Sequence, residues 1–175
     1  MKEIIGDRII LRLMTIEDTD LIIKWRNSER VYKNFIYQKP FTREGHLHWI
    51  HTMIDTGEAI QFIICEKETN RPIGSVYFRD IDDMNHKAEY GIFIGEAEAA
   101  GHGIGTETAK LVIHYGFEEM KLHKIVLRAL ADNEQAIRSY EKAGFEREAY
   151  LHDEVCIHNS YNDIVLMGII NPQED

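Results

Sequence analysis

The middle of the chain contains three short β-rich runs joined by very short connections. The runs cover residues 61–66, 73–78 and 88–94, and turn-forming residues fill 69–72 and 82–85 between them. Strands linked this closely have to be antiparallel, because a parallel crossover needs a dozen or more residues. The sequence therefore predicts a three-stranded antiparallel meander.

Alternating helix and strand patterns flank the meander on both sides. Before it we expect a strand over 8–13, a helix that Thr15 and Asp18 open, a helical stretch over 28–36, and a helix that Thr42 caps. After it we expect the following elements: a helix over 104–119, a strand over 124–130, a helix over 133–142 that stops at Gly144, and strands over 148–157 and 163–170. The pattern predicts one α/β domain over 1–175, with a mixed, mostly antiparallel central sheet flanked by helices.

Composition excludes several classes of protein. The 175 residues include only two cysteines, Cys65 and Cys156, which is too few for a disulfide framework and favours a reducing cytoplasm. The net charge of −10, without a long basic cluster, disfavours nucleic acid as a partner. Charges interrupt every apolar run, so we expect no signal peptide and no membrane partner. The nine histidines lack metal-ligand spacing, and no metal site is predicted.

Three alternating glycines stand immediately before and inside the start of the helix expected from Ile104. Gly101, Gly103 and Gly105 let the backbone approach an anion, and the first turn of a helix offers free N–H groups there. The same glycines also suit a plain flexible loop. A P-loop is excluded, because no Gly-Lys-Ser/Thr follows, and a Rossmann fingerprint is disfavoured by the antiparallel meander before it.

A second motif, Asn133-x-x-Ala136-x-x-x-Tyr140-x-Lys142-x-Gly144-Phe145, follows the next strand. Together with the glycine loop, it resembles the GNAT N-acetyltransferase superfamily, most strongly over residues 89–145. The resemblance implies acetyl-CoA as acetyl donor, with its pyrophosphate on the loop and its pantetheine arm along the preceding strand. The residues then expected to bind the cofactor are Ile92, Phe93, Ile94, Ala100, Gly101, His102, Gly103, Ile104, Gly105, Thr106, Asn133 and Lys142. Ala100 replaces the family's usual Arg or Gln, and His102 replaces a common Lys, which should weaken but not abolish binding.

The same resemblance suggests catalytic roles for two residues. Tyr140 matches the family's tyrosine near the sulfur, where a phenol can protonate the thiolate that leaves. Glu89 is the candidate base for the attacking amine, directly or through a water, and N–H groups around Ile92 to Ile94 can polarise the acetyl carbonyl. The competing interpretations are core packing for Tyr140, a solvated carboxylate for Glu89, and a plain helix N-cap for Asn133.

The acceptor is expected to be a small-molecule amine. The chain resembles the branch with ribosomal-protein N-terminal, spermidine and pseudaminic-pathway amino-sugar acetyltransferases. The strings Trp25-Arg26-Asn27 and His46-Leu47 are similar to the last type, and imply that Arg26, His46 and Tyr90 bind a nucleotide-linked amino sugar. A protein N-terminus, an antibiotic-like amine, a polyamine suited to the acidic chain, and a non-catalytic acyl-CoA-binding domain stay open. A homodimer is also expected, since edge-strand pairing is common in the family.

Overall fold

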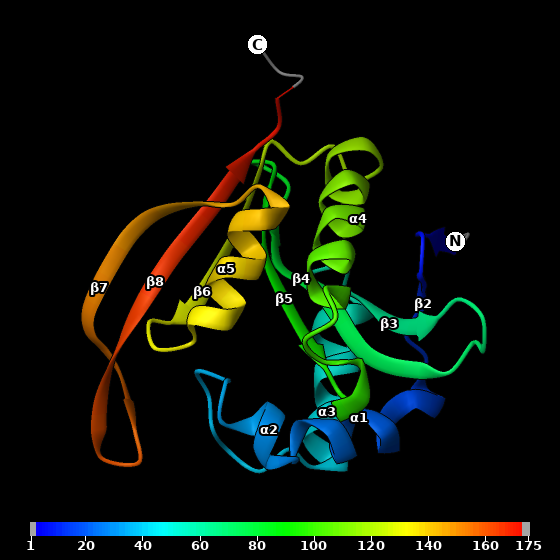
Figure 1. The fold of residues 1–175 in the computed structure, drawn as a ribbon, viewed down its shortest axis with the longest axis horizontal. Helices are drawn as coiled ribbons and strands as arrows, with labels where there is room; N and C mark the ends of the chain where they lie inside the picture. Colours follow the sequence, from blue (N-terminus) through cyan, green and yellow to red (C-terminus); the bar gives the residue numbers. More distant parts are fainter. Residues whose placement is uncertain (1–2, 173–175) are drawn as a thin grey trace.

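A computed structural model describes residues 3–172, and its centre is one eight-stranded sheet (Figure 1). The strands lie in the order β1-β2-β3-β4-β5-β6-β8-β7, and every neighbouring pair is antiparallel except β5 with β6. Their bounds are β1 Ile4–Ile5, β2 Ile9–Leu13, β3 Ile60–Glu66, β4 Pro72–Asp82, β5 Lys87–Ile94, β6 Lys124–Leu130, β7 Glu146–Ile157 and β8 Ser160–Ile170. The predicted mixed, mostly antiparallel sheet is confirmed, as is the meander β3-β4-β5 within it.

The helices fall before and after the meander, as expected. They are α1 Thr19–Arg26, α2 Glu29–Tyr32, α3 Arg43–Trp49, α4 Ile104–Glu118 and α5 Glu134–Ala143, with short turns η1 Ile16–Asp18, η2 Ile50–Ile54 and η3 Ala97–Ala99. The expected helical stretch over 28–36 is wrong beyond Tyr32. The side-chain amide of Asn34 donates to the carbonyl of Arg30 at 2.9 Å, which competes with the next backbone bond of the helix.

Helices cover both faces of the sheet, and the side chains of β3 show which face is which. Phe62 and Ile64 belong to the larger core beneath α4 and α5, whereas Ile63 and Cys65 belong to a smaller core with Ile22 of α1. This alternation follows from the two-residue period of a strand. The runs of apolar residues in β3 therefore reflect burial on both faces.

Strands β5 and β6 pair over only three residues before they separate (Figure 1). The last pair is Glu89 with Val126, although β5 continues to Ile94 and β6 to Leu130. The N–H of Gly95 donates to the carbonyl of Ile73 on β4 at 2.7 Å, so alternation along β5 turns the backbone groups of Ile94 and Ile92 away from β4. Among residues 3–172, these groups have no strand partner and lie at a gap in the sheet.

The chain closes with a β7–β8 hairpin whose tip is His158 and Asn159, both at positive φ (49° and 64°). Two residues in this conformation suit the right-handed twist of a hairpin. Over residues 3–172, no helix has the length and apolar character needed to cross a membrane.

Candidate functional site

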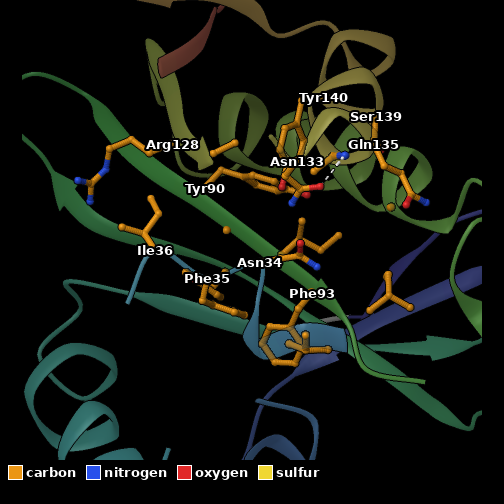
Figure 2. Close-up of a pocket in the computed structure, with 18 of the residues that line it drawn as sticks. Asn34, Phe35, Ile36, Tyr90, Phe93, Arg128, Asn133, Gln135, Ser139 and Tyr140 are labelled. Carbon is orange, nitrogen blue, oxygen red and sulfur yellow. Dashed lines mark hydrogen bonds between the residues drawn. The ribbon is translucent and has the colours of Figure 1, made fainter. Parts of the chain in front are cut away.

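A cleft of about 1080 Å³ opens at the gap between β5 and β6, and residues from both faces of the sheet line it. Figure 2 shows Tyr140 and Asn133 on one side of β5, and Phe35 and the ring of Phe93 on the other. The sequence-predicted residues that line this cleft are Arg26, His46, Glu89, Tyr90, Ile92, Phe93, Ile94, Ala100, Gly101, Gly103, Gly105, Thr106, Asn133, Tyr140 and Lys142. His102 and Ile104 belong to the same loop and helix start but do not line the cleft.

The glycine loop has the shape that its sequence predicts. Gly101 and Gly103 have φ values of +82° and +80°, in the left-handed region that favours glycine. Gly103 is the N-cap of α4 and provides no side chain to cap it. The N–H groups of the first turn of α4 are therefore free to bind an anion, with the positive end of the helix dipole behind them.

Tyr140 lies on α5 within a cluster of aromatic rings at the edge of the cleft. Its ring meets those of Tyr90 and Phe145 edge-to-face, with centroids 6.0 and 6.1 Å apart. Burial, with a smaller contribution from Tyr77, raises the pKa of Tyr140 above its ordinary value of 10. The phenol is therefore protonated at neutral pH, as a proton donor has to be. Tyr90 is 3% exposed, and its buried hydroxyl has no hydrogen-bond partner within the described chain.

The side chain of Asn133 caps α5 and accepts from the N–H of Ala136 at 3.3 Å (Figure 2). The N-cap interpretation of this residue is thus confirmed, and its position in the cleft also leaves its cofactor role open. The hydroxyls of Thr106 on α4 and Ser139 on α5 hydrogen-bond at 2.9 Å. This pair joins the two helices that form one wall of the cleft.

Glu89 is the last residue of β5 that pairs with β6, as its expected place before the splayed part requires. Its Oε1 accepts from Arg79 at 2.6 Å and from Arg128 at 3.4 Å. Among the described residues, no hydrogen bond goes to Oε2. Glu89 is thus a carboxylate at the mouth of the gap with one oxygen held and the other available.

Arg26 lies on the opposite side of the sheet, between two aromatic rings. Its guanidinium carbon is 3.3 Å from the centroid of Phe35 and 4.8 Å from that of Phe41. Its Nε is buried without a hydrogen-bond partner, and no carboxylate in the described chain forms an ion pair with it. Burial and, less strongly, the nearby Arg79 lower the pKa of Arg26, with Tyr77 opposing them. The cleft therefore contains a cation without a counter-ion.

His46 is buried beside Arg26, and one of its two ring nitrogens is unsatisfied. Nδ1 lies 3.1 Å from the hydroxyl of Thr19, whereas Nε2 has no partner in the described structure. Burial is the main cause that lowers the pKa of His46 below 6.5, so the ring is neutral at pH 7. Neutral imidazole nitrogens can each donate or accept one hydrogen bond, according to the tautomer.

Several arginines of the site were not singled out from the sequence. Arg30 donates from α2 to the carbonyls of Ile94 (2.8 Å) and Gly95 (2.6 Å), and so satisfies oxygens that lack a strand partner. Arg79 is opposite Glu89 in the β4–β5 register, but the register shifts between Arg79 and Asp82, so the short turn over 82–85 does not by itself specify this pair. Nothing local in the sequence marks Arg30.

Residues 3–172 contain no group of three or more His, Cys, Asp or Glu side chains placed to hold a metal ion.

The chain is similar to known proteins both in sequence and in structure. The family model described as "Acetyltransferase (GNAT) domain" matches residues 8–146. An uncharacterized N-acetyltransferase p20 of Bacillus licheniformis is 30% identical over 174 residues, 97% of each chain. A spermidine N(1)-acetyltransferase of Vibrio cholerae is 27% identical over 161 residues, 91% of this chain and 92% of the relative. A crystal structure of spermidine N-acetyltransferase from Vibrio cholerae with CoA and spermine has a TM-score of 0.85 at 24% identity, covering 93% and 95% of the two chains.

Proposed function

The chain belongs to the GNAT acetyltransferase family and is an acetyl-CoA-dependent N-acetyltransferase, and we propose that its acceptor is an amine that carries an anionic group. A nucleotide-linked amino sugar is the acceptor of this kind that the sequence resemblance favours. The observation that carries the proposal is Arg26, a half-buried cation in the cleft whose Nε is buried without a partner and which has no counter-ion among the described residues.

The donor fits the side of the cleft that α4, α5 and β5 form. The loop at Gly101 and Gly103 and the first turn of α4 suit the pyrophosphate, because free N–H groups bind anions there. The backbone groups of Ile92 and the N–H of Ile94 face the gap and suit the amide-rich pantetheine arm. In this placement the arm occupies the position of a missing strand, and the thioester lies near Tyr140.

The reaction requires that the attacking amine lose a proton and that the departing thiolate gain one. The amine nitrogen attacks the thioester carbon, the carbonyl oxygen becomes an oxyanion, and the carbon–sulfur bond then breaks. Glu89 accepts the amine proton through a water at its free Oε2, and the phenol of Tyr140 gives its proton to the departing thiolate. The N–H groups near Ile92 stabilise the oxyanion, as such donors do in acyl transfer.

Charge on the acceptor side supports an anionic substrate. Arg26, Arg79 and Arg128 line the cleft there, and Glu89 is shared between the last two. An arginine binds a phosphate through paired N–H groups, and its own desolvation is then offset by the ligand's charge. His46 adds a second polar group, since its Nε2 lacks a partner.

A polyamine is the second candidate, and the named relatives favour it over the amino sugar. The Vibrio cholerae relative is a spermidine enzyme, and the chain's net charge of −10 attracts cations at long range. Against it, a polyamine needs several free carboxylates within the cleft. Of the three in the described chain that line it, Glu89 and Glu134 are already paired with arginines, which leaves Asp132. The two candidates therefore differ in the sign of the charge that the cleft has to bind.

An amine panel with acetyl-CoA tests the proposal. Release of the CoA thiol is measured with a UDP-linked 4-amino sugar, the free amino sugar, spermidine, spermine and a short peptide. We expect the highest kcat/KM with the nucleotide-linked sugar, and a clear loss for the free sugar, which lacks the diphosphate. Preference for spermidine over both sugars would replace the anionic acceptor with the polyamine.

The homodimer expected from the sequence stays a prediction. Strands β1 and β7 are the two edges of the sheet, and β7 is the longer, with 12 residues. An unpaired edge of that length is where a second copy could add its own strand.

A further inference from the structure

Arg8 precedes β2 and reaches across the fold to the glycine loop. Its guanidinium donates from Nη1 to the carbonyl of His102 at 2.7 Å and from Nε to the carboxylate of Glu107 at 2.8 Å. Its backbone N–H donates to the other oxygen of Glu107, also at 2.8 Å. Arg8 does not line the cleft itself, so these bonds hold the loop from the side that faces away from the cleft.

The bond to His102 fixes the direction of an N–H group that does line the cleft. The carbonyl of His102 and the N–H of Gly103 belong to one planar trans peptide, in which they point in opposite directions. Because Arg8 binds the oxygen, the N–H of Gly103 is turned away from Arg8. The guanidinium also lies close to Gly103, since Nη2 is 3.4 Å from where a Cβ on that residue would stand.

The bond to Glu107 neutralises a negative charge close to the expected position of the phosphates. Glu107 is in the first turn of α4, where a carboxylate stabilises the helix but repels an anion at the same N-terminus. The loop offers no fixed cation in return, because Ala100 stands where the family usually has Arg or Gln. The guanidinium of Arg8 is the positive charge that the structure places against this carboxylate.

We propose that Arg8 is a positioning residue for acetyl-CoA, which orients the N–H of Gly103 toward the pyrophosphate and neutralises Glu107 beside it. This inference rests on the proposed placement of the pyrophosphate on the glycine loop. It goes beyond that placement in assigning the phosphate affinity partly to a residue that is outside the cleft and 94 positions away from the loop in sequence.

Two donors separate this role from general structural support. Arg8→Gln should weaken binding of acetyl-CoA about 10- to 100-fold, the range for loss of a charged hydrogen bond, measured by calorimetry. Binding of S-acetylpantetheine, which keeps the thioester and the arm but has no phosphate, should not change in a tryptophan-fluorescence titration. The matched control is Arg147→Gln, which breaks an ion pair with Glu141 outside the cleft and should affect neither donor. The two arginines are similarly exposed, at 57% and 52%, and the two pairs have similar lengths, at 2.9 and 2.8 Å.

A double-mutant cycle tests the neutralising part of the role. If Arg8 offsets the charge of Glu107, Arg8→Gln should cost less acetyl-CoA affinity in a Glu107→Gln background than in the natural one. Should Arg8→Gln fail to fold, Arg8→Lys serves, because an ammonium cannot reproduce both bonds of the guanidinium, and at least several-fold weaker binding is expected.

Two results would overturn the proposal. One is unchanged acetyl-CoA affinity in folded Arg8→Gln or Arg8→Lys, and the other is an equal loss with acetyl-CoA and S-acetylpantetheine. Failure of the unmutated protein to bind acetyl-CoA more tightly than S-acetylpantetheine would instead contradict the placement of the pyrophosphate on the loop.

Discussion

Replacing Arg26 with methionine removes the cation that we propose for substrate binding. The Nε of Arg26 is buried without a partner, the cation has no counter-ion in the described chain, and the desolvation of an unpaired charge costs several kcal/mol. The rings of Phe35 and Phe41 return part of this, about 2 kcal/mol for a desolvated cation–π contact. Methionine keeps a flexible apolar chain between the rings and gains about 0.3–1.5 kcal/mol from sulfur–aromatic contact.

The balance favours the variant in the absence of substrate. We expect Arg26→Met to stabilise the free protein by about 1 kcal/mol, since desolvation of Arg26 is no longer required. For a chain of this length that is an increase in Tm of about 2–4 °C, measured by calorimetric unfolding. The KM for a UDP-linked amino sugar should rise about 10- to 100-fold, with acetyl-CoA affinity unchanged.

Arg26→Lys is the control, because it keeps the positive charge but replaces the planar guanidinium that stacks on Phe35 with an ammonium group. It should show no stabilisation and a smaller increase in KM. A decrease in Tm of more than 2 °C in Arg26→Met would refute the reasoning, since it would make Arg26 a structural cation that the rings fully compensate. An equal change in KM for spermidine and for the sugar nucleotide would refute the ligand part.

Three further predictions concern the donor, the acid and pH. Gly103→Asp introduces a residue that tolerates positive φ but places a carboxylate at the loop. Acetyl-CoA at 100 times Kd should raise the unfolding free energy of the natural protein by about 2.7 kcal/mol, and this increase should be absent from thermal scans of the variant. Tyr140→Phe should lower kcat about 100-fold with little change in acetyl-CoA affinity, and unchanged turnover with chemistry rate-limiting would assign Tyr140 to packing. Because burial lowers the pKa of His46, the unfolded chain binds the proton first on acidification, so the free energy of unfolding should decrease as pH falls through 6.5. Urea unfolding at pH 5 and 8 should show a smaller decrease in His46→Gln, and an identical pH dependence would contradict a depressed pKa.

The fold was largely predictable, because its signals are local. Short turns forced the antiparallel meander, and the strand over 124–130 was predicted with the bounds that β6 has. The error at α2 arose from a side-chain bond of Asn34, which competes with helix propensity and leaves no pattern in hydrophobicity. Strand β1 was missed because two residues are too short for periodicity to be seen.

The cleft was predictable only where a motif marks it. Residues 89–145 carry the glycine loop and the Tyr140 helix, and the structure brings these together. The arginines that hold the site act across long sequence separations: Arg30 binds the carbonyls of Ile94 and Gly95, 64 and 65 positions away. Such contacts depend on how the two faces of the sheet meet, which no single stretch of sequence specifies.

The separation of β5 and β6 also affects the order in which donor and acceptor can bind and products can leave. The cleft is lined from both faces of the sheet, by Tyr140 on the α5 side and by Arg26 on the α1 side. In the proposed placement, donor and acceptor therefore approach from opposite faces and meet in the gap. In that placement the acceptor does not have to pass the bound donor to reach the gap, nor the donor the bound acceptor. Access alone then imposes no sequence on arrival or departure, and any compulsory order measured in kinetics has to come from a change in affinity when the first partner binds.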